Sequence, residues 1–96
     1  MKADEKILVR HNPAEHRFET EVEGLLCVAD YEVRGEQMIF THTFVPPALR
    51  GRGIAEKLVR LALEHARTER LRVVPACSYV KVFIERHAEF KPLLAS

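Results

Sequence analysis

Residues 45–55 read Val-Pro-Pro-Ala-Leu-Arg-Gly-Arg-Gly-Ile-Ala and join the end of an apolar, β-branched run to the start of an amphipathic helix. The run before them, residues 38–45, predicts a strand. Pro46 and Pro47 stop this strand because two consecutive prolines remove two backbone donors. The residues that follow, from about 52 to 68, predict a helix. The centre of the predicted structure is therefore a strand, a glycine-containing turn and a helix.

The turn between this strand and helix has the features of a phosphate cradle. Gly51 and Gly53 let the backbone come close to a ligand, and the N–H groups of the first helical turn point outward with the positive end of the helix dipole behind them. Arg50 and Arg52 add charge that can pair with phosphate oxygens. A G-x-G alone also serves ordinary strand-to-helix turns, so this simpler interpretation stays open. The chain has no third glycine for G-x-G-x-x-G and no Gly-Lys-Ser/Thr for a P-loop.

Length and composition predict one globular domain over residues 1–96. The chain is 47% hydrophobic and 30% charged, and its net charge of +1 gives no overall field for nucleic acid or a membrane surface. No apolar run approaches the roughly 20 residues of a membrane span, and the polar residues 1–6 do not resemble a signal peptide, so we expect a cytoplasmic protein. Cys27 and Cys77 lack metal-ligand spacing; we expect free thiols and no metal site.

Periodicity along the chain predicts an α/β fold with a mostly antiparallel sheet and two helices. The strands at residues 17–23, 25–34 and 38–45 are expected to be antiparallel neighbours, with turns at Gly24 and Gly35. A short strand is expected at residues 7–9 and a final one at 71–74, ended by Pro75. The second helix is expected at 78–87, and a tail at 91–94.

The faces of the two helices can be predicted from their apolar positions. The first helix should bury a wide arc against the sheet and a second element. This arc comprises Ile54, Leu58, Leu61, Ala62 and His65, with Ala55, Val59 and Ala66 beside them. The second helix should bury Val80, Phe83, Ile84 and His87.

Three motifs together resemble the GNAT acetyltransferases, and most closely their short single-domain group. Arg50, Gly53 and Ala55 occupy the three specified places of the acyl-CoA motif Q/R-x-x-G-x-G/A. The chain also carries His-Thr-Phe-Val-Pro at residues 42–46 and Pro-Ala-Cys-Ser-Tyr-Val at residues 75–80, in the expected order around the glycine turn.

The resemblance implies a minimal GNAT fold that binds acetyl-CoA between two splayed central strands. The predicted order of strands and helices agrees with it. The pyrophosphate of CoA would lie on the glycine turn, where the implied cofactor-binding residues are Val45, Arg50, Gly51, Arg52, Gly53, Ile54 and Ala55.

Acetyl transfer to an amine needs a base and a way to release the thiolate, and three residues are candidates. His42 lies on the strand beside the expected thioester, and the ordinary pKa of histidine, about 6.5, suits a base at neutral pH. It is alternatively a core histidine, because alternation places Phe40 and Phe44 on its face. Cys77 lies before a helix, and a helix N-terminus lowers the pKa of a cysteine. Cys77 is thus a candidate nucleophile, proton donor or packing residue.

Several features of the larger enzymes are missing. Ile84 lies near the position of their usual tyrosine acid, so Tyr79 or Cys77 would have to replace it. Cys27, inside an apolar strand, is expected to be a packing residue.

The predicted function is acetyl transfer from acetyl-CoA to an amine of a small molecule or protein. The alternative is an acyl-CoA-binding module of the same fold with little or no catalysis. A nucleic-acid adaptor using the arginines is disfavoured because no aromatic stacking surface accompanies them. Segments that shape the acceptor pocket in larger relatives are absent, so the cleft should be wide and open. The sequence does not identify the acceptor or the oligomeric state.

Overall fold

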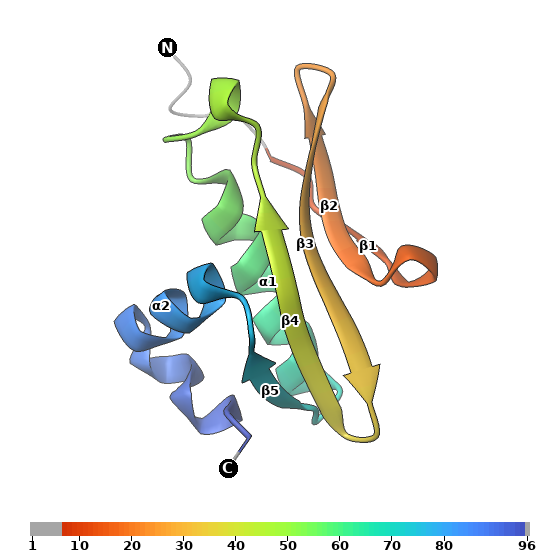
Figure 1. Ribbon diagram of the computed structural model, residues 1–96, viewed down its shortest axis with the longest axis vertical. Coiled ribbons are helices and arrows are strands. Elements are labelled where there is room, and N and C mark those ends of the chain that lie inside the picture. The colour runs from red at the N-terminus through yellow and green to blue at the C-terminus, as the bar shows by residue number, and fades with distance from the viewer. Residues whose placement is uncertain (1–6, 96) are drawn as a thin grey trace.

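In the computed structural model, which describes residues 7–95, five strands form one mixed sheet in the order β1-β2-β3-β4-β5 (Figure 1). Neighbouring strands from β1 to β4 are antiparallel, and β4 and β5 are parallel. This arrangement confirms the predicted mixed, mostly antiparallel sheet. The strands are β1 (Arg10–Asn12), β2 (Arg17–Val22), β3 (Leu25–Arg34), β4 (Gln37–Phe44) and β5 (Arg72–Pro75). The helices are α1 (Ile54–Thr68) and α2 (Ser78–Arg86), with short 3-10 helices η1 (Pro13–Glu15), η2 (Pro47–Leu49) and η3 (Ala88–Leu93).

The parallel pair at one side of the sheet explains the position of α1. Parallel strands need a crossover connection, and α1 provides it by running across one face of the sheet from the end of β4 to the start of β5 (Figure 1). Two-residue turns at Glu23-Gly24 and Gly35-Glu36 make the β2–β3 and β3–β4 hairpins. Gly24 and Gly35 have φ of +77° and +58°, which explains the glycines.

The core lies between the sheet and α1, and it corrects the predicted face of this helix. Ile54, Leu58, Ala62 and Ala66 are buried as expected. Leu61 is instead 46% exposed, whereas Leu63 is fully buried. The buried arc is rotated toward Val59 and Leu63 because α2 and η3 pack beside this flank of the helix.

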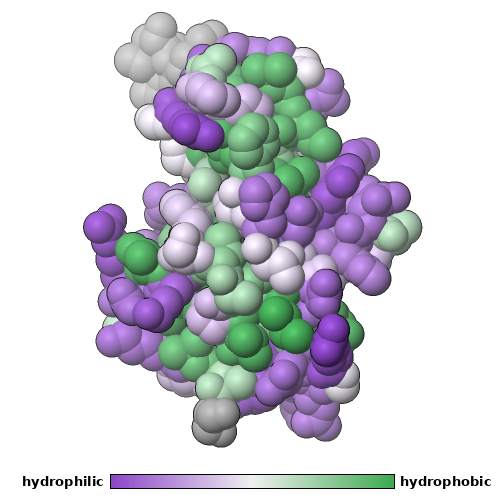
Figure 2. Space-filling model, in the orientation of Figure 1, coloured by the Kyte–Doolittle hydropathy of each residue, from purple (hydrophilic) through white to green (hydrophobic). Residues whose placement is uncertain are grey.

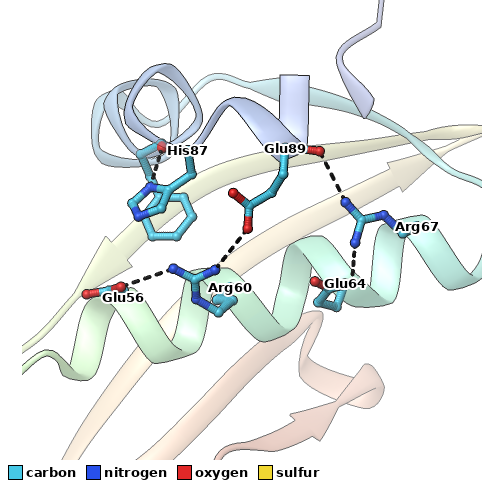
Figure 3. A network of polar contacts seen from close by, with 7 residues as sticks. Glu56, Arg60, Glu64, Arg67, His87 and Glu89 are labelled. Atoms are coloured by element: carbon cyan, nitrogen blue, oxygen red, sulfur yellow. Dashed lines mark hydrogen bonds and ion pairs between the residues drawn. The ribbon is translucent and has the colours of Figure 1, made fainter. Parts of the chain in front are cut away.

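A polar network on α1 holds α2 and η3 in place (Figure 3). The Arg60 guanidinium lies 5.5 Å from the Phe83 ring centroid of α2 and bonds to Glu56 and to Glu89 of η3. Arg67 donates to the Glu89 carbonyl oxygen. Cation–π contacts and charge-assisted bonds thus hold the second half of α2 and η3 against α1.

A bulge in β4 changes which side chains face the helices. Asp30 of β3 lies opposite His42, but the next residue, Tyr31, lies opposite Phe40, so Thr41 is the extra residue. Thr43, opposite the buried Ala29, shares the helix-covered face with Phe40. His42 therefore lies on the opposite face, and the prediction that it shares a face with Phe40 is wrong.

Some predicted boundaries also differ from the structure. The first strand forms at Arg10–Asn12 rather than at residues 7–9, and it pairs with the first half of β2, Arg17 to Glu19. The final strand includes Pro75, and the tail at residues 91–94 belongs partly to η3. Val80, Phe83 and Ile84 of α2 are buried, as predicted. Among residues 7–95, no helix is long and apolar enough to cross a bilayer.

The sheet face turned away from α1 is partly apolar and exposed. Figure 2 views the molecule with α1 behind the sheet, and hydrophobic side chains gather over the β2–β3 hairpin. Leu26 of β3 and Phe44 of β4 are about 40% exposed. This surface is called the outer face below.

Candidate functional site

The turn that enters α1 has the backbone predicted for a phosphate cradle. Gly51 and Gly53 have φ of +87° and +78°, and Gly53 is the N-cap of the helix. A Cβ atom at either glycine would meet nothing within 4 Å apart from its chain neighbours. Glycine is therefore favoured by the left-handed backbone rather than by crowding.

The first turn of α1 presents backbone donors without a capping side chain. The first intrahelical bond runs from the Lys57 N–H to the Gly53 carbonyl oxygen, 3.2 Å away. The N–H groups of residues 54–56 precede this bond and have no helical carbonyl to receive them. Glycine at the N-cap has no side chain to accept from them. The buried Ile54 anchors this turn to the core.

The two arginines of the turn already have partners in the protein. Arg50 donates through Nε to the Val45 carbonyl oxygen at 2.9 Å, which holds the start of the loop against its end. Arg52 pairs with Glu23 of the β2–β3 turn at 2.9 Å. The positive charge expected beside a phosphate is therefore present. The sequence did not predict that Arg52 would form an ion pair with Glu23.

The β4 and β5 strands separate at Phe40, before the chain reaches this turn. Their pairing ends at Phe40 opposite Pro75, after which the Cys77 N–H still donates to the Phe40 carbonyl oxygen at 2.8 Å. β4 continues for four more residues, 41–44, without pairing to β5. The region between this unpaired end of β4 and residues 76–77, which follow β5, is called the gap below.

Cys77 lies at the inner end of the gap, where it is the N-cap of α2. It is half-buried, and its sulfur lies 3.5 Å from the Thr43 hydroxyl oxygen on β4. Its side chain makes no capping bond to the N–H groups of α2. Cys77 precedes the helix, as expected, but its polar contact is to Thr43 of β4 rather than to the helix end.

Tyr79 lies two residues further along, on the side of α2 that faces the start of α1. It is 39% exposed, and it lines a pocket of about 140 Å³ together with Glu56 and Arg86. Partial burial, and then the charge of Glu56, raise the pKa of the Tyr79 phenol. The phenol therefore stays protonated at neutral pH and can donate a hydrogen bond.

His42 is not brought together with Cys77. Its side chain is exposed on the outer face, and its ring stacks at 6.3 Å on that of Phe44. The alternative prediction of a core histidine is wrong, because the bulge at Thr41 turns His42 out of the core. Its role as a base stays a prediction.

The remaining cysteine is a packing residue, as predicted. Cys27 is fully buried in β3, and burial raises the pKa of its thiol. Among the described residues, 7–95, no group of three or more His, Cys, Asp or Glu side chains is placed to hold a metal ion.

Comparison with known proteins connects this geometry to a family. The family described as "GCN5-related N-acetyl-transferase" matches residues 17–93. Protein NATD1 from Bos taurus is 34% identical over 84 residues, which cover 84% of this chain and 74% of the relative. Protein NATD1 from Homo sapiens is 32% identical over the same length, with the same coverage. The NMR solution structure of a GCN5-like protein from Staphylococcus aureus superposes with a TM-score of 0.75 at 23% identity, covering 96% of this chain and 91% of that one.

Proposed function

The chain belongs to the GCN5-related N-acetyltransferase family, and on that premise we propose that it binds acetyl-CoA and transfers the acetyl group to an amine. The observation that carries the proposal is the uncapped start of α1 at the mouth of the gap. Backbone donors and two left-handed glycines lie there, and β4 leads toward them after its pairing with β5 has ended. Such a helix end suits the pyrophosphate of a nucleotide.

The residues that would hold CoA are those of the glycine turn. The N–H groups of Ile54 and Ala55 would donate to the pyrophosphate, and Gly51 and Gly53 would let it approach. Arg50 and Arg52 would supply positive charge, and Val45 lies at the strand end where the gap opens. Bound acetyl-CoA supplies an activated acetyl group as a thioester.

The chain's own side chains would move the protons of the reaction. His42 would take a proton from the acceptor amine on the outer face. Tyr79, whose phenol stays protonated at neutral pH, or Cys77 would donate a proton to the departing sulfur of CoA. Cys77 is also a candidate nucleophile because its sulfur lies beside the gap.

The acceptor and the setting are also part of the proposal. The exposed outer face around His42 would admit a small amine or an amine side chain of a protein as the acceptor. Neither a membrane nor nucleic acid is a proposed partner. The free thiols Cys27 and Cys77 fit a reducing, cytoplasmic environment for a single domain of 96 residues.

A second candidate function is acyl-CoA binding without efficient catalysis. It is favoured by one observation: His42 lies on the outer face, whereas Thr43 and Cys77 meet on the helix-covered side of β4. A base that does not converge with the acid would leave binding intact and chemistry slow.

Two measurements separate these functions. Calorimetry with CoA tests the site, and absence of heat from binding by the folded protein would reject both candidates. Release of free thiol from acetyl-CoA, followed with a panel of amines and lysine peptides, tests transfer. Binding without amine-dependent thiol release would leave the binding module.

A further inference from the structure

Thr43 and Cys77 form a side-chain contact that joins the two walls of the gap. Thr43 lies on the unpaired end of β4, Cys77 lies at the start of α2, and Oγ1 is 3.5 Å from Sγ. The two residues are 34 positions apart in the sequence. The contact therefore depends on the fold rather than on local chain geometry.

The backbone on both sides of this contact is fixed. Cys77 donates its N–H to Phe40 and accepts from the Lys81 N–H at 3.1 Å. Thr43 is half-buried opposite Ala29 and, as a β-branched residue, has few χ1 rotamers. Rotation about the Cys77 Cα–Cβ bond is left as the main freedom of the sulfur. The Thr43 hydroxyl is placed to restrict that rotation.

We propose that Thr43 is a positioning residue for Cys77: its hydroxyl donates a hydrogen bond to the sulfur when the sulfur is a thiolate, and holds it toward the gap. The importance of this contact for acetyl transfer rests on the proposed function. A hydroxyl can donate to a thiolate, whereas the helix N–H groups make no bond to this side chain. The chain thus stabilises the reactive form of Cys77 from β4.

The proposal is tested by the rate at which iodoacetamide alkylates Cys77 in the absence of CoA, followed by peptide mass at pH 7. Because the thiolate is the reacting form, Thr43→Val should slow alkylation by about tenfold, the effect of losing one hydrogen bond to a charged group. Thr43→Ser retains the hydroxyl and should stay within about twofold of the unmodified protein. Thr68→Val is the control, since Thr68 is an exposed threonine at the end of α1 and lies outside the β4 bulge.

Equal alkylation rates in Thr43→Val and the unmodified protein would overturn the proposal. So would equal slowing by Thr43→Ser, because a retained hydroxyl should rescue the rate. If Thr43→Val shows no melting transition, Thr43→Ala replaces it and should be slowed similarly.

Calorimetry with CoA on the unmodified protein keeps the two questions apart. Failure to bind CoA would reject the proposed function and leave the alkylation result valid. Normal binding with unchanged alkylation would reject only the role of Thr43.

Discussion

Replacing Gly53 with glutamate places a negative charge at the N-cap of α1, where the pyrophosphate of CoA would lie. The new Cβ meets nothing within 4 Å, so the side chain has room and should not displace the core. The backbone at Gly53 has φ of +78°, and a non-glycine residue in this region costs about 1–2 kcal/mol. We therefore expect a folded protein whose melting temperature is lowered by roughly 4–16 °C.

The effect on CoA binding should be at least as large as the effect on folding. A carboxylate about 4 Å from a phosphate charge costs about 1 kcal/mol in water and about 4 kcal/mol near a protein surface. The dissociation constant for CoA should therefore rise by about fivefold to 10³-fold in Gly53→Glu.

Gly35→Glu is the matched control for this substitution. Gly35 has φ of +58°, it also has open space around its Cβ, and it lies in the β3–β4 turn at the other end of β4 (Figure 1). Its backbone cost should be similar and its CoA affinity normal. Calorimetry of both variants, with melting curves, measures the two effects. A folded Gly53→Glu protein with unchanged affinity would refute the cradle.

Three further predictions concern catalysis and pH. His42→Ala should lower amine acetylation by about 10²-fold with little loss of CoA affinity; a stable variant with normal turnover would refute its role as a base. The Glu19 carboxyl is buried, and its pKa is lowered to about 2, chiefly by the hydrogen bond from Arg17. Its ionised form therefore stabilises the fold at neutral pH, and this stabilisation is lost as the pH falls from 4.5 to 2. Glu19→Gln should therefore cost about 1–3 kcal/mol at pH 7 in urea unfolding, with a difference that shrinks toward pH 2. Burial and the nearby His65 lower the pKa of His11 in the folded protein. On acidification, His11 is therefore protonated at a higher pH in the unfolded chain than in the folded one, and the free energy of unfolding should fall as the pH drops below about 6.5. His11→Phe should remove this decrease; an unchanged pH profile of unfolding would contradict it.

The sequence was informative where one residue type determines the local backbone. Gly24 and Gly35 predicted both hairpin turns, because two-residue turns need left-handed residues. Gly53 and the prolines before it predicted where β4 ends and α1 begins. The strand boundaries of β3 followed from apolar content and turns, and these predictions required no tertiary information.

The predictions that failed depended on contacts between distant segments. The bulge at Thr41 is a register shift against β3, and alternation within β4 alone cannot reveal it. Leu61 and Leu63 are both apolar, and the packing of α2 and η3 on α1 decides which one is buried. The pairing of Arg52 with Glu23 likewise requires the β2–β3 hairpin to reach the glycine turn.

The bulge also explains why the candidate site divides between two faces of one strand. Without the extra residue Thr41, alternation would place His42 beside Phe40 and under the helices, where an amine in solution could not reach it. With the bulge, Thr43 turns inward to Cys77 and His42 turns outward, and both stay next to the unpaired end of β4. Side chains on the two faces of a sheet are separated by its backbone. They can approach the same reacting bond only at a position where the strand has no neighbour on one side. The separation of β4 from β5 provides that opening, which is why loss of His42 should affect the acceptor reaction and leave CoA affinity nearly unchanged.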